Sequence, residues 1–141
     1  MVFLYFYNLR KNKGMTIKIP VSVGELFDKI TILQNKLEKI TDITKLNNVK
    51  KEYDFLTEIA FEIDKNYQAG TLYKSLFEIN QELWGIEDAK REHEANKDFG
   101  EKFIYWARQV YIKNDERARI KKQINLAYGS EIVEEKSYKN V

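Results

Sequence analysis

The chain has 141 residues, of which 43% are hydrophobic and 33% charged, and its formal net charge is only +2. The length suits one domain, and the composition is too apolar for intrinsic disorder and too polar for a membrane protein. The absence of cysteine excludes disulfides and thiolate metal sites and fits a reducing compartment, so we expect a cytoplasmic protein.

The first fourteen residues differ from the rest. Their apolar run, residues 2–7, is too short for a transmembrane helix, which needs about 20 residues, or for a signal-peptide core. Met15 offers an alternative start, and the helical pattern begins only after it. We therefore predict that residues 1–14 are a dispensable extension, rather than a strand or clip over a groove, and that residues 15–141 form one helical domain.

Four stretches repeat apolar residues at alternating spacings of three and four, the pattern of helices that each bury one stripe. The stripes run from Leu26 to Ile40, from Leu46 to Ile63 and from Leu72 to Ile86, and Phe103, Trp106 and Val110 open the last. They predict an all-α protein. We expect an antiparallel, up-and-down, coiled-coil-like bundle of four to five helices joined by short connections.

Capping residues mark where two of these helices begin. Ser22 and Glu25 match the capping box, in which the serine accepts from the amide three residues on and the glutamate reaches back. Asp98 and Glu101 repeat the pattern before the last stripe. The first helix is therefore predicted to start just after Ser22 and the fourth near Asp98.

Glycines mark other features of the predicted helices. Gly70 suits the left-handed end of the second helix, and Thr71 suits the cap of the third, which we expect to end near Ala95. Gly85 lies inside that third helix, at a cost of about 1 kcal/mol relative to alanine. A kink or a close backbone approach at Gly85 is predicted from that cost.

The last stripe contains cations where apolar residues are expected. Continuing its phase places Lys113 and Arg117 at core positions, with apolar residues on both sides. Either one long helix buries two cations, or the helix breaks at Asn114-Asp115, both good capping residues. We predict the break, because an unpaired buried cation is costly.

The third and fourth predicted helices concentrate polar side chains toward each other. If their turn centres near Asp98, residues at equal height have numbers that sum to about 196, since both helices rise equally per residue. This register pairs Ile86 with Val110, His93 with Phe103, and Asp88 with Arg108.

An arginine-rich cleft between these helices offers a place for a small anion, because the guanidinium fork matches carboxylate or phosphate. We favour the structural alternative, in which Asp88 and Arg108 form an interhelical ion pair and Glu87 bridges to Arg91. The candidate ligand-binding residues are Trp84, Glu87, Asp88, Arg91, Arg108, Tyr111, Asn114, Asp115 and Arg117.

No metal site, cofactor or catalytic residue is assigned. His93, the one histidine, follows Lys90 and not a glutamate at the three-residue spacing of di-iron bundles. The acidic pairs at residues 25 and 28 and at residues 131 and 134 lie at opposite ends of the chain, which disfavours a magnesium site. Glycine-rich phosphate loops, serine elbows and zinc-type spacings are missing too.

Nucleic acid is a weak alternative partner. Residues 117–122 carry four cations, but on more than one helix face and within a chain of small net charge. Nucleic-acid-binding domains usually show a larger basic excess, because their affinity comes from neutralising phosphates. We therefore favour a solvated helix face.

Four segments together resemble a family of small bacterial and phage-borne proteins known only as a domain of unknown function. They are IPVSVGELFDKITIL at residues 19–33, ELWGIED at 82–88, YIKNDERA at 111–118 and GSEIVEEKSY at 129–138. The resemblance covers nearly everything after Met15 and brings no activity. It implies that the tail beyond Gly129, the predicted end of the last helix, folds back on the bundle through residues 134–138.

These observations favour a non-enzymatic interaction or accessory module. We expect it to self-associate as a dimer, or to bind a protein partner, through apolar and aromatic surface such as Tyr73, Phe77 and Tyr105. The alternative is a small enzyme or sensor that binds an anionic metabolite in the arginine-rich cleft.

Overall fold

The computed structural model describes residues 14–141, and this part of the chain is entirely helical, without strands. Its elements are α2 (Val23–Lys39), α3 (Ile43–Ile63), the short 3-10 helix η1 (Tyr67–Ala69), α4 (Thr71–Ala95) and α5 (Glu101–Ala127). The predicted all-α helical bundle is confirmed. No helix of the described range is long and apolar enough to cross a membrane. The extension predicted at residues 1–14 lies, except for Gly14, outside the described residues.

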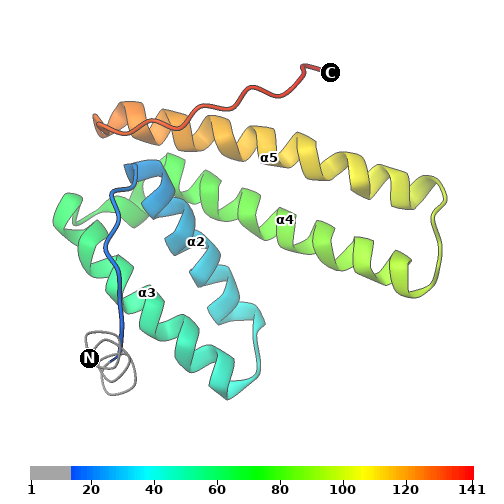
Figure 1. Cartoon of the computed structure of the whole chain (residues 1–141), viewed down its shortest axis with the longest axis horizontal. Coiled ribbons are helices and arrows are strands. Elements are labelled where there is room, and N and C mark those ends of the chain that lie inside the picture. Colours follow the sequence, from blue (N-terminus) through cyan, green and yellow to red (C-terminus); the bar gives the residue numbers. More distant parts are fainter. Residues whose placement is uncertain (1–13) are drawn as a thin grey trace, which may run out of the picture.

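Helix α2 is the centre of the arrangement. Its backbone lies against α3, α4 and α5, whereas the backbone of α3 comes close only to α2 and η1 among the described elements. Helices α4 and α5 form a long antiparallel hairpin with the most extensive contact of any pair. Figure 1 shows that the far half of this hairpin extends beyond α2 and α3.

The hydrophobic core lies at the end of the hairpin on which α2 packs. An aromatic group surrounds Phe27, whose ring centroid is 5.4 Å from that of Tyr67 and 5.2 Å from that of Tyr128. The buried members of the core are Leu26, Phe27, Ile30, Ala60, Tyr67, Tyr73, Leu76, Ile79, Ile120 and Ile124. These residues come from all four helices and η1, so the core joins the two helical hairpins into one unit.

The predicted start of α2 and the predicted end of α5 are confirmed. The Ser22 side chain accepts a hydrogen bond of 3.0 Å from the Glu25 amide. The Glu25 carboxylate binds Lys121 at 2.6 Å instead of reaching back to Ser22, because an ammonium group is a stronger partner than a neutral amide. At the other end Gly129 has a φ of 63°, the left-handed geometry that ends α5.

The predicted junction between the second and third helices is wrong. Helix α3 ends at Ile63, and Gly70 has a φ of −65°, which is not left-handed. Gly70, and not Thr71, occupies the cap position of α4. The chain turns earlier because the Asp64 carboxylate accepts from the Asn66 amide at 2.9 Å, a local turn that leads into η1.

The turn between α4 and α5 keeps the predicted register but not the predicted cap. His93 lies beside Phe103, with ring centroids 6.5 Å apart, which confirms that pair. Gly100 occupies the cap position of α5. The Asp98 carboxylate instead contacts the His93 ring at 3.1 Å and accepts from the Gly100 amide at 3.2 Å, so it organises the turn.

Helix α5 runs unbroken through Asn114-Asp115, so the predicted break is wrong. The premise failed because the cations at Lys113 and Arg117 have carboxylate partners on other helices. Residues 14–141 do not show the predicted close approach at Gly85 either, because a Cβ built there meets none of their atoms within 4 Å.

Candidate functional site

A ladder of ion pairs joins α5 to α2 and α4. Three cations follow one another at four-residue intervals on α5, a spacing that places them on one helix face. Each meets a carboxylate from a different turn or helix. The pairs are Lys113 with Glu82 at 2.7 Å, Arg117 with Asp28 at 2.5 Å and Lys121 with Glu25 at 2.6 Å.

Asp28 is the centre of this ladder and is only 1% exposed. Arg117 binds it with two nitrogens, Nε at 2.8 Å from Oδ1 and Nη2 at 2.5 Å from Oδ2. The Asn80 amide donates to Asp28 Oδ1 and to Thr31 Oγ1, each at 2.9 Å. Hydrogen bonding to Asp28 raises the pKa of Arg117 above its ordinary value, although burial acts in the opposite direction. The carboxylate is therefore fully engaged inside the protein.

The tail after α5 docks through charged side chains, which confirms that it folds back on the bundle. The Glu134 carboxylate accepts from the Ser22 hydroxyl and from the Asn125 amide, the latter at 3.1 Å. Burial tends to raise the pKa of Glu134, but these hydrogen bonds and nearby Lys121 outweigh it and leave the pKa below its ordinary value. Two ion pairs follow: Glu135 with Lys122 at 3.2 Å, and Lys136 with Asp115 at 3.3 Å.

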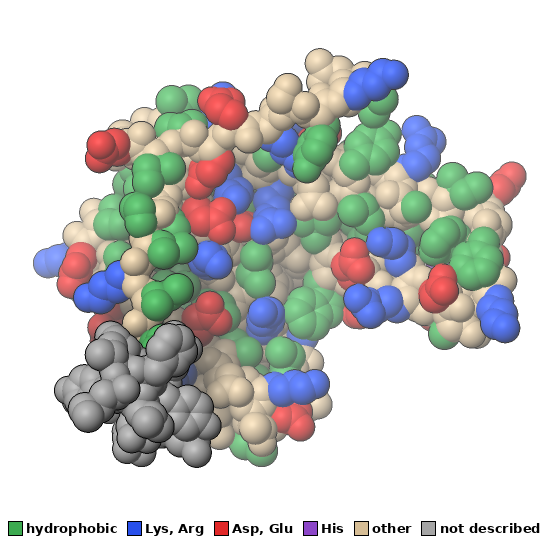
Figure 2. All heavy atoms as spheres, in the orientation of Figure 1, with side chains coloured by type: hydrophobic (Ala, Val, Ile, Leu, Met, Phe, Trp, Pro, Cys, Tyr) green, Lys and Arg blue, Asp and Glu red, His purple; other side chains and the backbone are tan. Residues whose placement is uncertain are grey.

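A groove of about 270 Å³ lies between α5 and this tail. Its cations are Arg117, Lys121, Lys122 and Lys136, and its own carboxylates are Glu134 and Glu135. Asp28 and Glu25 hold two of the cations from the α2 side, so positive and negative charges balance. Figure 2 shows acidic and basic side chains interspersed in this region. Within residues 14–141, no three metal-ligating side chains are grouped to hold an ion.

The predicted candidate residues separate into two groups. Asn114, Asp115 and Arg117 lie near the tail, where Asn114 Oδ1 accepts from Arg117 Nη1 at 3.3 Å. The other six lie along the far half of the hairpin. They are Trp84, Glu87, Asp88, Arg91, Arg108 and Tyr111, and among them Glu87 approaches Arg91 at 3.9 Å, as predicted.

The predicted ion pair between Asp88 and Arg108 is wrong. Both residues are exposed, and no hydrogen bond or ion pair joins them. Asp88 lies two residues after Ile86 on α4, and Arg108 lies two residues before Val110 on α5. Two residues correspond to a rotation of about 200° around an α-helix, so both charged side chains point away from the side that faces the other helix. The register predicted their height along the hairpin but not their direction around it.

Sequence reasoning missed the carboxylates that pair with α5, namely Glu25, Asp28 and Glu82. A signal was present, because Asp28 interrupts the buried positions of α2 just as Arg117 interrupts those of α5. Opposite charges at core positions of two helices indicate a buried pair, since either charge alone would be costly.

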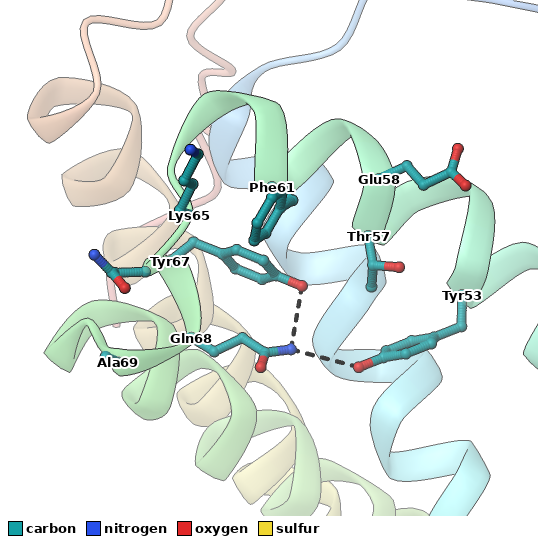
Figure 3. Close-up of a pocket in the computed structure, with 9 residues that line it drawn as sticks. Tyr53, Thr57, Glu58, Phe61, Lys65, Tyr67, Gln68 and Ala69 are labelled. Atoms are coloured by element: carbon teal, nitrogen blue, oxygen red, sulfur yellow. Dashed lines mark hydrogen bonds between the residues drawn. The ribbon is translucent and has the colours of Figure 1, made fainter.

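A second groove, of about 570 Å³, lies between α3 and η1 and holds none of the predicted candidates. Tyr53, Thr57 and Phe61 line its α3 side, and Tyr67 and Gln68 line the other. Figure 3 shows the Gln68 amide between the two tyrosine hydroxyls, to which it donates at 3.4 Å and 3.1 Å. The amide thereby links two of the three aromatic rings that line the groove.

Comparison with known proteins adds a family but no activity. A family model described as a family of unknown function (DUF6165) matches residues 17–141. No curated protein and no solved structure matches the chain.

Proposed function

Since the chain belongs to that family of unknown function, we propose from its geometry that it is a non-enzymatic helical interaction module that self-associates. The observation that supports this proposal is the far half of the α4–α5 hairpin, residues 83–112, which we call the projecting hairpin. Figure 1 shows that it extends beyond α2 and α3.

The projecting hairpin leaves most of its apolar side chains in contact with water. Ile86 is the one buried apolar residue of this stretch. Five large apolar side chains are 37% to 54% exposed: Phe99, Ile104, Tyr105, Tyr111 and Ile112. Apolar area gains about 25 cal/mol per Å² when it leaves water, so a second chain that covers this surface would be stabilised. An apolar surface of this kind is typical of protein interfaces.

The geometry moves the proposed interface away from two of the residues suggested by the sequence. Tyr73 is 5% exposed, and its hydroxyl donates to Gln34 at 3.0 Å, so its assignment to the surface is wrong. Phe77 is half-buried, and its backbone carbonyl accepts from Asn35 at 3.3 Å. Tyr105 is 54% exposed and lies on the projecting hairpin.

Sedimentation velocity of the full chain over a wide concentration range tests this proposal. We expect a monomer at low concentration and a dimer at high concentration. Replacing Tyr105 with serine is expected to weaken the dimer. The matched control is Phe55→Ser, an aromatic of similar exposure on α3, outside the projecting hairpin, which should leave association unchanged. A monomer at the highest concentration reached would contradict self-association.

The groove between α5 and the tail supports a second candidate function, that of a sensor for an anionic metabolite. Its four cations favour an anion, whereas the balancing carboxylates oppose one. A thermal-shift panel of phosphorylated and carboxylated metabolites decides between them, because a ligand at 100 times its Kd adds about 2.7 kcal/mol. A shift that disappears in Lys122→Gln would support the sensor, and the absence of any shift would contradict it.

A further inference from the structure

We propose that the projecting hairpin binds a second copy of this chain in parallel, so that α4 of each copy lies on α5 of the other. This inference rests on the proposed self-association and names its surface and geometry. The surface is a hollow of about 580 Å³ between α4 and α5, which we call the hairpin groove. Its lining residues on α4 are Ala89, Glu92 and His93, and those on α5 are Glu101, Lys102, Tyr105 and Trp106.

The two sides of the hairpin groove differ in size. Ala89 is small, and Gly85, one turn earlier on the same face of α4, has no side chain at all. On α5 the rings of Tyr105 and Trp106 stand 5.0 Å apart, and Ile112 follows two turns after Tyr105. The α4 side is therefore low at Gly85 and Ala89 and rises at Glu92 and His93, whereas the α5 side is high at Tyr105 and Trp106. A second hairpin can fill the low part with its own high wall.

No contact within residues 14–141 explains the glycine at position 85. A glycine inside a helix costs about 1 kcal/mol relative to alanine, yet a Cβ at Gly85 would meet nothing within 4 Å. Gly24 shows the contrast, because a Cβ there would lie 2.5 Å from the carbonyl oxygen of Lys121. Close approach by another chain over Gly85 accounts for the missing side chain.

A twofold axis parallel to the hairpin matches the low wall of each copy to the high wall of the other. Such an axis keeps every residue at its height and exchanges α4 with α5. The His93–Phe103 contact sets these heights. Ala89 then faces the height of Trp106 in the second copy, and Gly85 faces that of Ile112. An antiparallel pairing would stack α4 on α4, small residues against small, and leave a gap.

The same axis also matches charges. Glu92 and Lys102 lie on opposite walls of the hairpin groove at nearly equal height. In the parallel dimer, Glu92 of each copy faces Lys102 of the other, so the pair forms twice. This repetition is what a self-complementary twofold interface requires. Complementary shape and charge together identify a second copy as the occupant.

The first test introduces a large side chain at Gly85. Gly85→Arg should weaken the dimer at least about tenfold while leaving the fold intact, because arginine is a good helix former and the position is open. Glu94→Arg is the matched control: it adds the same side chain at an exposed site nine residues away, about half a turn around α4. Sedimentation and circular dichroism report association and helicity. A wild-type-like dimer in Gly85→Arg would overturn the proposed surface.

The second test exchanges the charges. Glu92→Lys and Lys102→Glu should each weaken their own dimer about tenfold, because two like-charged contacts replace two attractive ones. Mixing the two variants should restore association, since both contacts of the mixed dimer are attractive. Contacts within one chain cannot produce restoration on mixing.

The outcomes separate this inference from the proposed function. Suppose that the wild-type chain dimerises, that Gly85→Arg dimerises equally well, and that mixing the two charge variants restores no association. This result would overturn the parallel hairpin geometry but leave self-association standing. A wild-type chain that stays monomeric at every concentration would overturn both.

Discussion

Asp28 is a buried carboxylate whose pairing with Arg117 allows both charges to lie inside the fold. A carboxylate that is 1% exposed is tolerated because Arg117 binds it with two nitrogens and Asn80 donates a third hydrogen bond. The same pairing lets Arg117 occupy a core position of α5 without breaking the helix. Removing either charge leaves the other without its partner, which costs more than the pair itself contributes.

Asp28→Asn is therefore expected to destabilise the fold by about 3 kcal/mol. The value is at the lower end for buried pairs because the Arg117 side chain is 27% exposed and retains some hydration. Asp88→Asn is the matched control, since that carboxylate is exposed, and its effect should stay within about 0.5 kcal/mol. Urea denaturation measures both variants. Equal effects of the two would contradict the role given to Asp28.

The lowered pKa of Glu134 predicts how the stability of the fold changes in acid. Its pKa in the folded protein lies below the ordinary 4.5, so its contribution to stability is present above that pH and is lost as the pH falls through the lowered value. Glu134→Gln should therefore destabilise the fold at neutral pH, and the difference from wild type should shrink below pH 4.5. Denaturation curves at several pH values check this. A difference that stays constant with pH would rule out the linkage.

At the scale of elements, the start of α2 is built around a close approach to α5. The Gly24 amide donates to the Asn125 side chain at 2.6 Å, and Asn125 also donates to Glu134 in the tail. A side chain on Gly24 would occupy the space of the α5 backbone. The beginning of one helix and the end of another are thus specified together with the docked tail.

Two glycine substitutions of identical chemistry should have opposite effects. Gly24→Ala is expected to destabilise the fold by about 1–3 kcal/mol, because its Cβ would lie 2.5 Å from a backbone oxygen. Gly85→Ala should stabilise the monomer by up to about 1 kcal/mol, because alanine favours the helix and meets nothing. Thermal unfolding at low concentration measures both. Destabilisation by Gly85→Ala would show a contact within the chain that the structure lacks.

For the whole molecule, the core lies at one end and leaves the other end thinly packed. Ten buried core residues join α2, α3, η1 and the base of the α4–α5 hairpin. The projecting hairpin has two helices side by side and little buried area. Local stability follows local packing, so the two ends of the hairpin should open independently.

Hydrogen exchange should reveal this difference within single helices. We expect amides of residues 84–112 to exchange at least about tenfold faster in the monomer than those of residues 73–80 and 117–125. Association should then protect the projecting hairpin selectively, because the second copy covers it. Mass spectrometry on peptides from both ends of α4 and α5 provides the measurement. Uniform protection along both helices would contradict a thinly packed end.

Periodicity was enough to predict the helices and the hairpin register, but not their angular contacts. Ser22 and Gly129 marked real boundaries because their capping is local, and His93 met Phe103 because equal rise fixes height. Asp88 and Arg108 do not pair, because the direction in which a side chain points around its helix depends on which helix face packs against the neighbour. Three of the predicted site residues, Asn114, Asp115 and Arg117, lie together near the tail, whereas the partner Asp28 is distant in sequence.

By itself, the amino-acid sequence determined the all-α class, the start of α2, the end of α5 and the antiparallel register of α4 and α5, because these depend on interactions between residues near in the chain. The tertiary structure alone decided that α5 continues through its cations, that Ser22 and Asn125 are the partners of Glu134 in the docked tail, and that residues 83–112 project. The physical reason is that burial and charge pairing are set by side chains brought together from distant parts of the chain. Whether a cation at a core position breaks a helix depends on a carboxylate 89 residues away.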